Sequence, residues 1–384
     1  MFMPPDKVQK NTVFATLIEC IQEIPDPRRL KRISYPLKDV ILMTICACLG
    51  GANNWVEVAH FCKDHAQWIQ NSLNFSGKIP SHDTFNRIFN LVYPSDLTVC
   101  LITWMEQCFT ALGIEQDRIH MDGKVLEAYA AENPLTLVRG WSEKLQCVIG
   151  SVRVDRGSNE ITALPKLLDQ IGLNKKIVTI DAIGAQKEIV EKITDKGGDY
   201  VIALKSNQFS LYEEASIFMN DIINYAMIVP HTREKSVEKN HGRIEERECV
   251  ATSAFEWLEQ ASLWKNLKTI FAIRTTISWL KKDKISTGIR YFISNLPAKA
   301  DQLLHIARSH WSIENKLHWP VDRYLDEDRS TIRDSYGAQN FSFLRTLVVA
   351  IVQREQRMRP GRSIATIRQS VNRNPNLIIM NLLS

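Results

Sequence analysis

The stretch IHMDGK at 119–124 and the stretch IVTIDA at 177–182 decide the fold of this chain. Each is an apolar run that ends in one aspartate, Asp122 or Asp181, followed by a small residue. A run of this kind is typical of a buried strand that delivers its carboxylate to the carboxyl edge of a sheet. The sequence therefore predicts two acidic side chains at one edge of a buried sheet.

A third acid, Glu314, lies in the stretch HWSIEN at 310–315, where we expect a helix. Two strand-end aspartates and one helix-borne glutamate suit a pair of Mg²⁺ ions, because hard cations prefer carboxylate oxygens. Such a pair stabilises both the attacking and the leaving oxygen in phosphoryl transfer. In the alternative interpretation the two aspartates have structural roles only, Asp122 as a turn residue and Asp181 as a helix cap.

The bulk properties exclude several classes of protein. With 384 residues the chain can bury a sizeable core, in more than one domain. Its eight cysteines form no Cys-x-x-Cys pair, which fits a reducing cytosol. No signal peptide is visible, and the longest apolar run, at 40–49, is too short to span a bilayer. We therefore expect a cytoplasmic protein that does not contact a membrane.

The net charge of +5 is small, but its distribution is informative. Basic residues cluster at 28–32, and the segment from Arg354 onward holds six arginines against one acid, Glu355. Clustered arginine suits a polyanion, because phosphate contacts release counterions. A solvated surface is the alternative for either cluster.

The periodicity of apolar residues predicts a mixed α/β (α+β) chain in several parts. Residues 1–112 read as a helical N-terminal domain, and 113–204 with 300–350 as a core of three strands, helix, strand, helix and strand. Residues 205–299 read as a mainly β insertion, because the roughly 130 residues that separate Asp181 from Glu314 are far more than one crossover needs. Residues 351–384 read as a basic C-terminal tail.

Six stretches, in this order, resemble the DDE-type insertion-sequence transposases of the H-repeat-associated (Rhs-linked) group. They are DGK at 122–124, RVDRGSNEITA at 153–163, TIDA at 179–182 with QKEI at 186–189, KGGDYV at 196–201, HGRIE at 241–245 and SHWSIENKLHW at 309–319. Each stretch alone is weak evidence for this group, whereas six stretches in the same order over nearly the whole chain are specific evidence for it.

The resemblance implies an RNase H-like catalytic core in which Asp122, Asp181 and Glu314 are catalytic and bind two Mg²⁺ or Mn²⁺ ions. It implies cleavage and strand transfer on double-stranded DNA, by a homodimer or higher assembly, in a cytoplasmic, nucleoid-associated location. The residues that we expect to contact DNA are Lys124, His241, Arg243, His310, Asn315 and His318. The helical N-terminal domain is expected to bind transposon ends.

Two departures from close relatives leave alternatives open. Glu127 stands where relatives carry a basic residue, and Arg139 stands where they tend to carry a small one. The chain is therefore also compatible with a degenerate or domesticated DNA-binding protein without catalysis, or with a metal-dependent nuclease that does not join strands.

Overall fold

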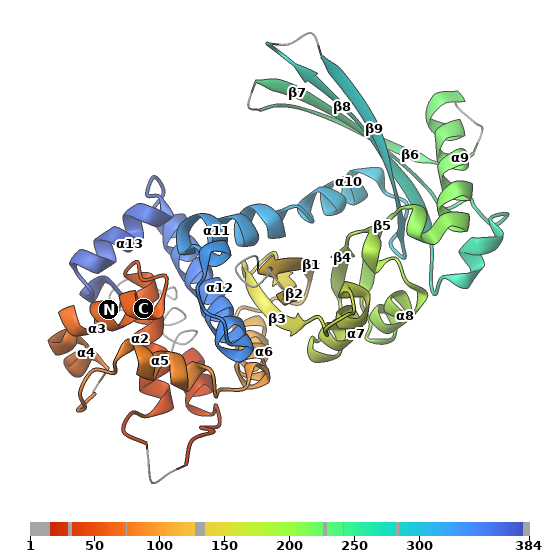
Figure 1. The fold of residues 1–384 in the computed structure, drawn as a ribbon. Coiled ribbons are helices and arrows are strands. Elements are labelled where there is room, and N and C mark those ends of the chain that lie inside the picture. The colour runs from red at the N-terminus through yellow and green to blue at the C-terminus, as the bar shows by residue number, and fades with distance from the viewer. Residues whose placement is uncertain are drawn as a thin grey trace, which may run out of the picture.

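The fold is built around one mixed sheet of nine strands, in the order β3-β2-β1-β4-β5-β9-β8-β7-β6 (Figure 1). The computed structural model describes residues 16–29, 33–73, 75–126, 135–225, 229–240, 242–281 and 284–378. The strands are β1 (Asp117–Leu126), β2 (Leu135–Ser142), β3 (Cys147–Arg153), β4 (Lys176–Ile180), β5 (Asp199–Leu204), β6 (Thr232–Asn240), β7 (Arg243–Thr252), β8 (Thr269–Trp279) and β9 (Ile285–Ser294).

The first five strands follow the predicted order. β1, β2 and β3 are antiparallel neighbours, whereas β4 and β5 run parallel to β1. Two helices, α7 (Glu160–Gln170) and α8 (Lys187–Asp195), make the crossovers to the parallel strands. Asn159 accepts a hydrogen bond from Ile161 N and so caps α7. The mixed α/β fold class predicted from the sequence is confirmed.

Segment 205–299 contributes four strands to the core sheet. Its four strands form an antiparallel meander, and β9 pairs with β5 through Val201 to Leu204. The segment also contains a helix of 17 residues, α9 (Phe209–Tyr225). The meander therefore extends the core sheet, because β5 would otherwise leave the backbone groups of one edge unpaired.

Alternating residues cover the two faces of this extended sheet. Val201, on β5, packs with Leu303 and Leu304 of α10 (Ala300–Ser309) on one face. Tyr200 and Ile202 point to the other face, where α8 and α9 lie. This alternation follows from the period of two of a strand. The sheet is therefore buried on both faces where β4, β5 and β9 meet.

Helices from both ends of the chain pack together beside the sheet (Figure 1). They are α2 (Leu37–Leu49), α3 (Trp55–Asp64), α4 (Ala66–Ser72), α5 (His82–Phe89), α6 (Pro94–Ala111), α11 (Trp319–Leu325), α12 (Ser335–Met358) and α13 (Ile364–Arg373). Trp55 stacks on Phe89 at 4.8 Å and meets the edge of Phe341, on α12, at 4.5 Å. The N-terminal helices therefore share a core with the end of the chain.

The segment expected as a basic tail is folded. Residues 351–358 complete α12, and α13 packs against α2. Arg368 is buried, and its guanidinium donates to the backbone oxygens of Cys48 and Ala52 and to Asn53 Oδ1 at 2.8 Å. At least this arginine serves packing, since its donors are satisfied by carbonyl groups inside the protein.

A membrane-spanning helix is not found in the part of the chain that the structure describes. Only α5 and α6 together match a span in length and composition, and they are bent by 82° relative to each other.

Candidate active site

Strand register brings Asp122 and Asp181 together. β1 and β4 are parallel, and Met121 pairs with Ile180, so the next residue on each strand is an aspartate. Asp122 Oδ1 accepts a hydrogen bond from Gly123 N at 3.0 Å, and Asp181 Oδ1 accepts one from Ile183 N at 3.1 Å. Each carboxylate thus keeps one oxygen, Oδ2, for another partner, so the turn and cap roles do not exhaust either side chain.

Glu314 reaches this edge from a helix that differs from the predicted one. The expected continuous helix ends at Ser309, and the chain resumes as a π-helical segment, Glu314–His318. Trp319 N donates to Glu314 O, which is the i+5 bond of a π turn. Single π turns inside helices occur often at functional sites. The wider turn places the Glu314 carboxylate beside β1.

The cluster that results contains Asp122, Glu314 and His318. One ligand atom from each lies within 4.8 Å of the others. His318 Nδ1 lies 3.1 Å from Glu314 Oε2 and 3.7 Å from Asp122 Oδ2, while its Nε2 is buried without a hydrogen-bond partner. The carboxylate oxygens suit Mg²⁺ or Mn²⁺. The residues present therefore fit a divalent cation.

A fourth acid, Glu160, approaches the same point from the first turn of α7. A Cβ atom built on Gly123 would lie 2.0 Å from Glu160 Oε1, so only glycine permits this approach. Burial and the charge of Asp181 raise the pKa of Glu160. The sequence analysis had given no role to Glu160. The motif Asp122-Gly123 was the signal that could have found it, since a glycine beside a site acid indicates a close neighbour.

The acids repel one another in the absence of a cation. Burial, followed by the charges of Glu160 and Asp181, raises the pKa of Asp122 to about 7. Glu314 behaves in the opposite way, because its hydrogen bond with His318 lowers its pKa. Such divergence of neighbouring carboxyl groups is typical of functional sites. A bound cation would favour the ionised form of Asp122.

These acids line a cleft of about 650 Å³ between the sheet and the segment that follows α10. Asp122, Asp181 and Glu314 are all in its wall, together with His310 and Arg290. The structure thus brings the three predicted catalytic acids into one cleft, with Glu160 against Gly123 beside them.

The residues predicted to contact DNA are placed differently. Lys124 Nζ lies 2.6 Å from Asp322 Oδ2 and 3.2 Å from Asp328 Oδ1, and only 10% of its side chain is exposed. It is therefore engaged in ion pairs and not presented to the cleft. Arg243 pairs with Glu245 at 2.5 Å and lines neither this cleft nor the next one. His241 lies outside the described residues, as does Glu127.

His310 and Asn315 do line clefts. His310 is in the wall beside the acids, whereas Asn315 is in an adjoining cleft of about 500 Å³ under β8 and β9. The two clefts share Arg290 and Trp311, whose ring lies 5.5 Å from the Arg290 guanidinium. They therefore form one continuous groove. Trp311 is 52% exposed there.

Comparison of the sequence with known proteins identifies the family of this chain. The model of the transposase DDE domain matches residues 140–351, and the model of the domain associated with it matches 18–105. The "H repeat-associated putative transposase YhhI" of Escherichia coli K12 is 33% identical, over 93% of this chain and 96% of its own length. The "Putative transposase YncI" of Escherichia coli O157:H7 is 32% identical, over 88% of this chain and 87% of its own.

A third relative, the "H repeat-associated putative transposase YbfD" of Escherichia coli K12, is 33% identical over 60% of this chain and 91% of its own length. The predicted resemblance to the H-repeat-associated group is confirmed. Since the domain model covers more than half of the chain and YhhI matches nearly all of it, the chain belongs to the DDE transposase family.

Proposed function

We propose that this protein is an insertion-sequence transposase that cleaves double-stranded DNA at the ends of its element and transfers the freed strands to a target. The observation that carries this proposal is the convergence of Asp122, Asp181 and Glu314 in one cleft, with the latter two inside the residues that the DDE-domain model matches. Two strand ends and a π-helical turn, far apart in sequence, meet there for no evident packing reason. Mutual repulsion of the acids is costly unless cations bind.

The acids of this cleft would hold two divalent ions, Mg²⁺ or Mn²⁺. When bound, these ions would activate the attacking oxygen and stabilise the leaving one. Asp122, Asp181 and Glu314 are the proposed ligands, and His318 orients Glu314 through its Nδ1 contact of 3.1 Å. Phosphoryl transfer depends mainly on positioning and charge stabilisation. A site of fixed acids on a buried sheet suits that requirement.

The continuous groove beside the acids is the proposed path of the DNA. Its second half is lined by Arg247, Arg290 and Arg308. Arg308 and Arg247 both pair with Glu238, at 2.6 and 3.2 Å. Arg290 is exposed and has no carboxylate partner among the described residues, so it is the cation best placed to meet a phosphate. A dimer is expected because two element ends must be cut and joined together.

Substitution of Arg290 by glutamine should weaken DNA binding by a similar factor for all sequences. One lost phosphate contact should also reduce the slope of log affinity against log salt by about 1. Fluorescence titrations at several salt concentrations measure both quantities. Lys166→Gln is the matched control, because Lys166 is exposed on α7 and pairs only with Asp155. An unchanged slope for the Arg290 variant would remove this residue from the path.

The function itself is tested with DNA fragments that carry the ends of the element containing this gene. We expect the protein to nick these ends with Mg²⁺ or Mn²⁺, and to join them to a second duplex. Cutting without joining would favour a nuclease. Binding without cutting, with either metal, would favour a degenerate or domesticated DNA-binding protein. Random cutting of unrelated DNA would contradict end recognition.

A further inference from the structure

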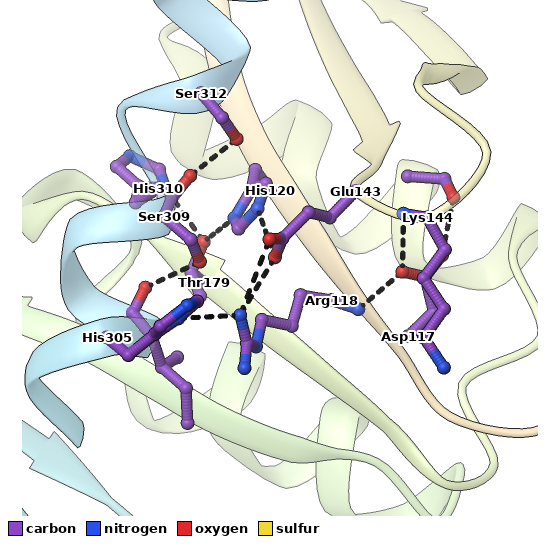
Figure 2. A network of polar contacts seen from close by, with 12 residues as sticks. Asp117, Arg118, His120, Glu143, Lys144, Thr179, His305, Ser309, His310 and Ser312 are labelled. Atoms are coloured by element: carbon purple, nitrogen blue, oxygen red, sulfur yellow. Dashed lines mark hydrogen bonds and ion pairs between the residues drawn. The ribbon is translucent and has the colours of Figure 1, made fainter. Parts of the chain in front are cut away.

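A chain of polar side chains runs between the strands and the α10 segment, from the acidic cleft toward the start of β1 (Figure 2). His310 Nδ1 lies 2.8 Å from Thr179 Oγ1, and Thr179 Oγ1 lies 2.6 Å from His120 Nδ1. His120 Nε2 then lies 3.4 Å from Glu143 Oε2. Arg118 Nη1 lies 3.2 Å from Glu143 Oε2 and 2.9 Å from Nδ1 of His305 on α10, where the chain ends. The proposed reaction makes no use of His120, Thr179 or Glu143.

The middle of this chain is enclosed. His120 and Thr179 are at most 1% exposed, and they lie side by side on the parallel strands β1 and β4. Apolar residues usually occupy such positions, since each buried polar group must find a partner. A threonine hydroxyl between two imidazole rings can donate only one hydrogen bond, so it must accept the other. The chain can therefore run in only two directions.

Glu143 determines which of the two directions of hydrogen-bond donation the chain adopts. Its carboxylate lies 3.4 Å from His120 Nε2, and this contact, together with Arg118, lowers the pKa of Glu143 to about 2 against the effect of burial. A carboxylate charge this close to Nε2 favours a proton on that nitrogen, so a neutral His120 leaves Nδ1 unprotonated. Thr179 must then donate to His120 Nδ1 and accept from His310 Nδ1. The proton of a neutral His310 is thereby placed on Nδ1.

His310 is neutral for a separate reason. Burial, with small contributions from His120 and His318, lowers the pKa of His310 to about 3. His310 also lines the acidic cleft, and its Nδ1 faces β4, so Nε2 is the nitrogen left for the cleft. An unprotonated nitrogen has no hydrogen to offer to a phosphate oxygen. This tautomer thus disagrees with the phosphate-contact role expected for His310 from the sequence.

We infer that His310 Nε2 is a hydrogen-bond acceptor that orients the attacking hydroxyl group in the cleft, and that Thr179, His120 and Glu143 hold it in this tautomer. The inference rests on the proposed function. The water that attacks DNA, or the 3′ hydroxyl that attacks the target, carries a hydrogen that a neutral acceptor can hold. The carboxylates beside it suit cations, so a neutral acceptor leaves them free for that task. Thr179, His120 and Glu143 act only through His310 and are positioning residues.

The tautomer can be observed directly without DNA or metal. We would label the histidines with ¹⁵N and identify the His310 signals by their loss in His310→Asn. In the wild type we expect protonated Nδ1 and unprotonated Nε2. Thr179→Val keeps the shape and removes the hydroxyl, so its His310 should move to the Nε2-protonated form. Thr179→Ser should retain the wild-type tautomer. A wild type with protonated Nε2 would overturn the inference.

A second variant, at Glu143, tests the inference even if Thr179→Val does not fold. Glu143 is partly exposed, with 25% of its side chain accessible, so Glu143→Gln should fold. Its amide can donate to His120 as well as accept from it, so both directions of the chain become possible. We expect a mixture of His310 tautomers. A single unchanged tautomer in both Glu143→Gln and a folded Thr179→Val would show that the chain does not control His310.

Cleavage kinetics separate this inference from the proposed function. Thr179→Val should slow single-turnover cleavage by about 10- to 100-fold, the effect of losing a supporting hydrogen bond. DNA affinity should not change, and Thr179→Ser should restore most of the rate. Equal rates for wild type and Thr179→Val would overturn the inference and leave the proposed function intact. A wild type with the expected tautomer that never cuts DNA would overturn the proposed function and support the tautomer.

Discussion

Replacement of Asp181 by asparagine should abolish DNA cleavage and leave folding and DNA binding near the wild-type level. The change removes one charge from the proposed ion-binding acids and almost no volume. The asparagine oxygen can still accept the hydrogen bond from Ile183 N, so the turn after β4 should persist. We expect a loss of at least about 100-fold, since even supporting groups of metal sites contribute 10- to 100-fold. Single-turnover cleavage with Mg²⁺ measures it.

The matched control for this variant is Asp169→Asn. Asp169 is an exposed acid at the far end of α7 that pairs with Lys192 at 2.6 Å. It carries the same chemical change away from the cleft, so its cleavage rate should stay near the wild-type value. Undiminished cleavage by Asp181→Asn would exclude Asp181 from the site. Loss of DNA affinity in that variant would instead indicate a binding role.

Replacement of Glu327 by glutamine should lower the free energy of unfolding by about 3–5 kcal/mol, the usual effect of breaking a buried ion pair. Glu327 is fully buried and lies 3.2 Å from Arg139 Nη2, while Ser342 Oγ donates to it at 2.6 Å. The glutamine would leave the guanidinium of Arg139 uncompensated inside the protein. Urea denaturation followed by circular dichroism measures the change.

Two further variants test whether the loss of stability comes from breaking the buried ion pair. Asp155→Asn removes one partner of an exposed pair, Lys166–Asp155, and should cost no more than about 1 kcal/mol. Arg139→Met combined with Glu327→Met removes both buried charges and should recover much of the loss. An effect of Glu327→Gln as small as that of Asp155→Asn would contradict a structural role for the buried pair.

The Arg139–Glu327 pair also gives a structural role to an arginine that the family resemblance did not lead us to expect. Arg139 is only 1% exposed, on β2, and it ties the core sheet to the 3₁₀ turn Glu327–Arg329. The neighbouring pair of Lys124 with Asp322 joins β1 to α11 in the same way. An arginine at 139 therefore does not indicate decay of the fold. It anchors the segment that carries Glu314 against the sheet.

The local pattern of the sequence was sufficient for the first five strands and for the two aspartates. An apolar run that ends in an acid predicts its own strand, and parallel strands share their carboxyl edge. The same pattern was insufficient for the π turn that begins at Glu314, because such a turn does not change the apolar spacing enough to be seen. It was also insufficient for segment 205–299, since antiparallel strands read alike whether they form a separate sheet or extend an existing one.

The sequence by itself thus determined the family, the order of the core elements and the acids at the ends of β1 and β4. Only the tertiary structure decided which side chains meet across long distances in the chain. Glu160 against Gly123, Lys124 with Asp322, and Thr179 between two histidines depend on such contacts. The physical reason is that local periodicity specifies which face a side chain occupies, whereas the partner on that face is chosen by packing of the whole chain.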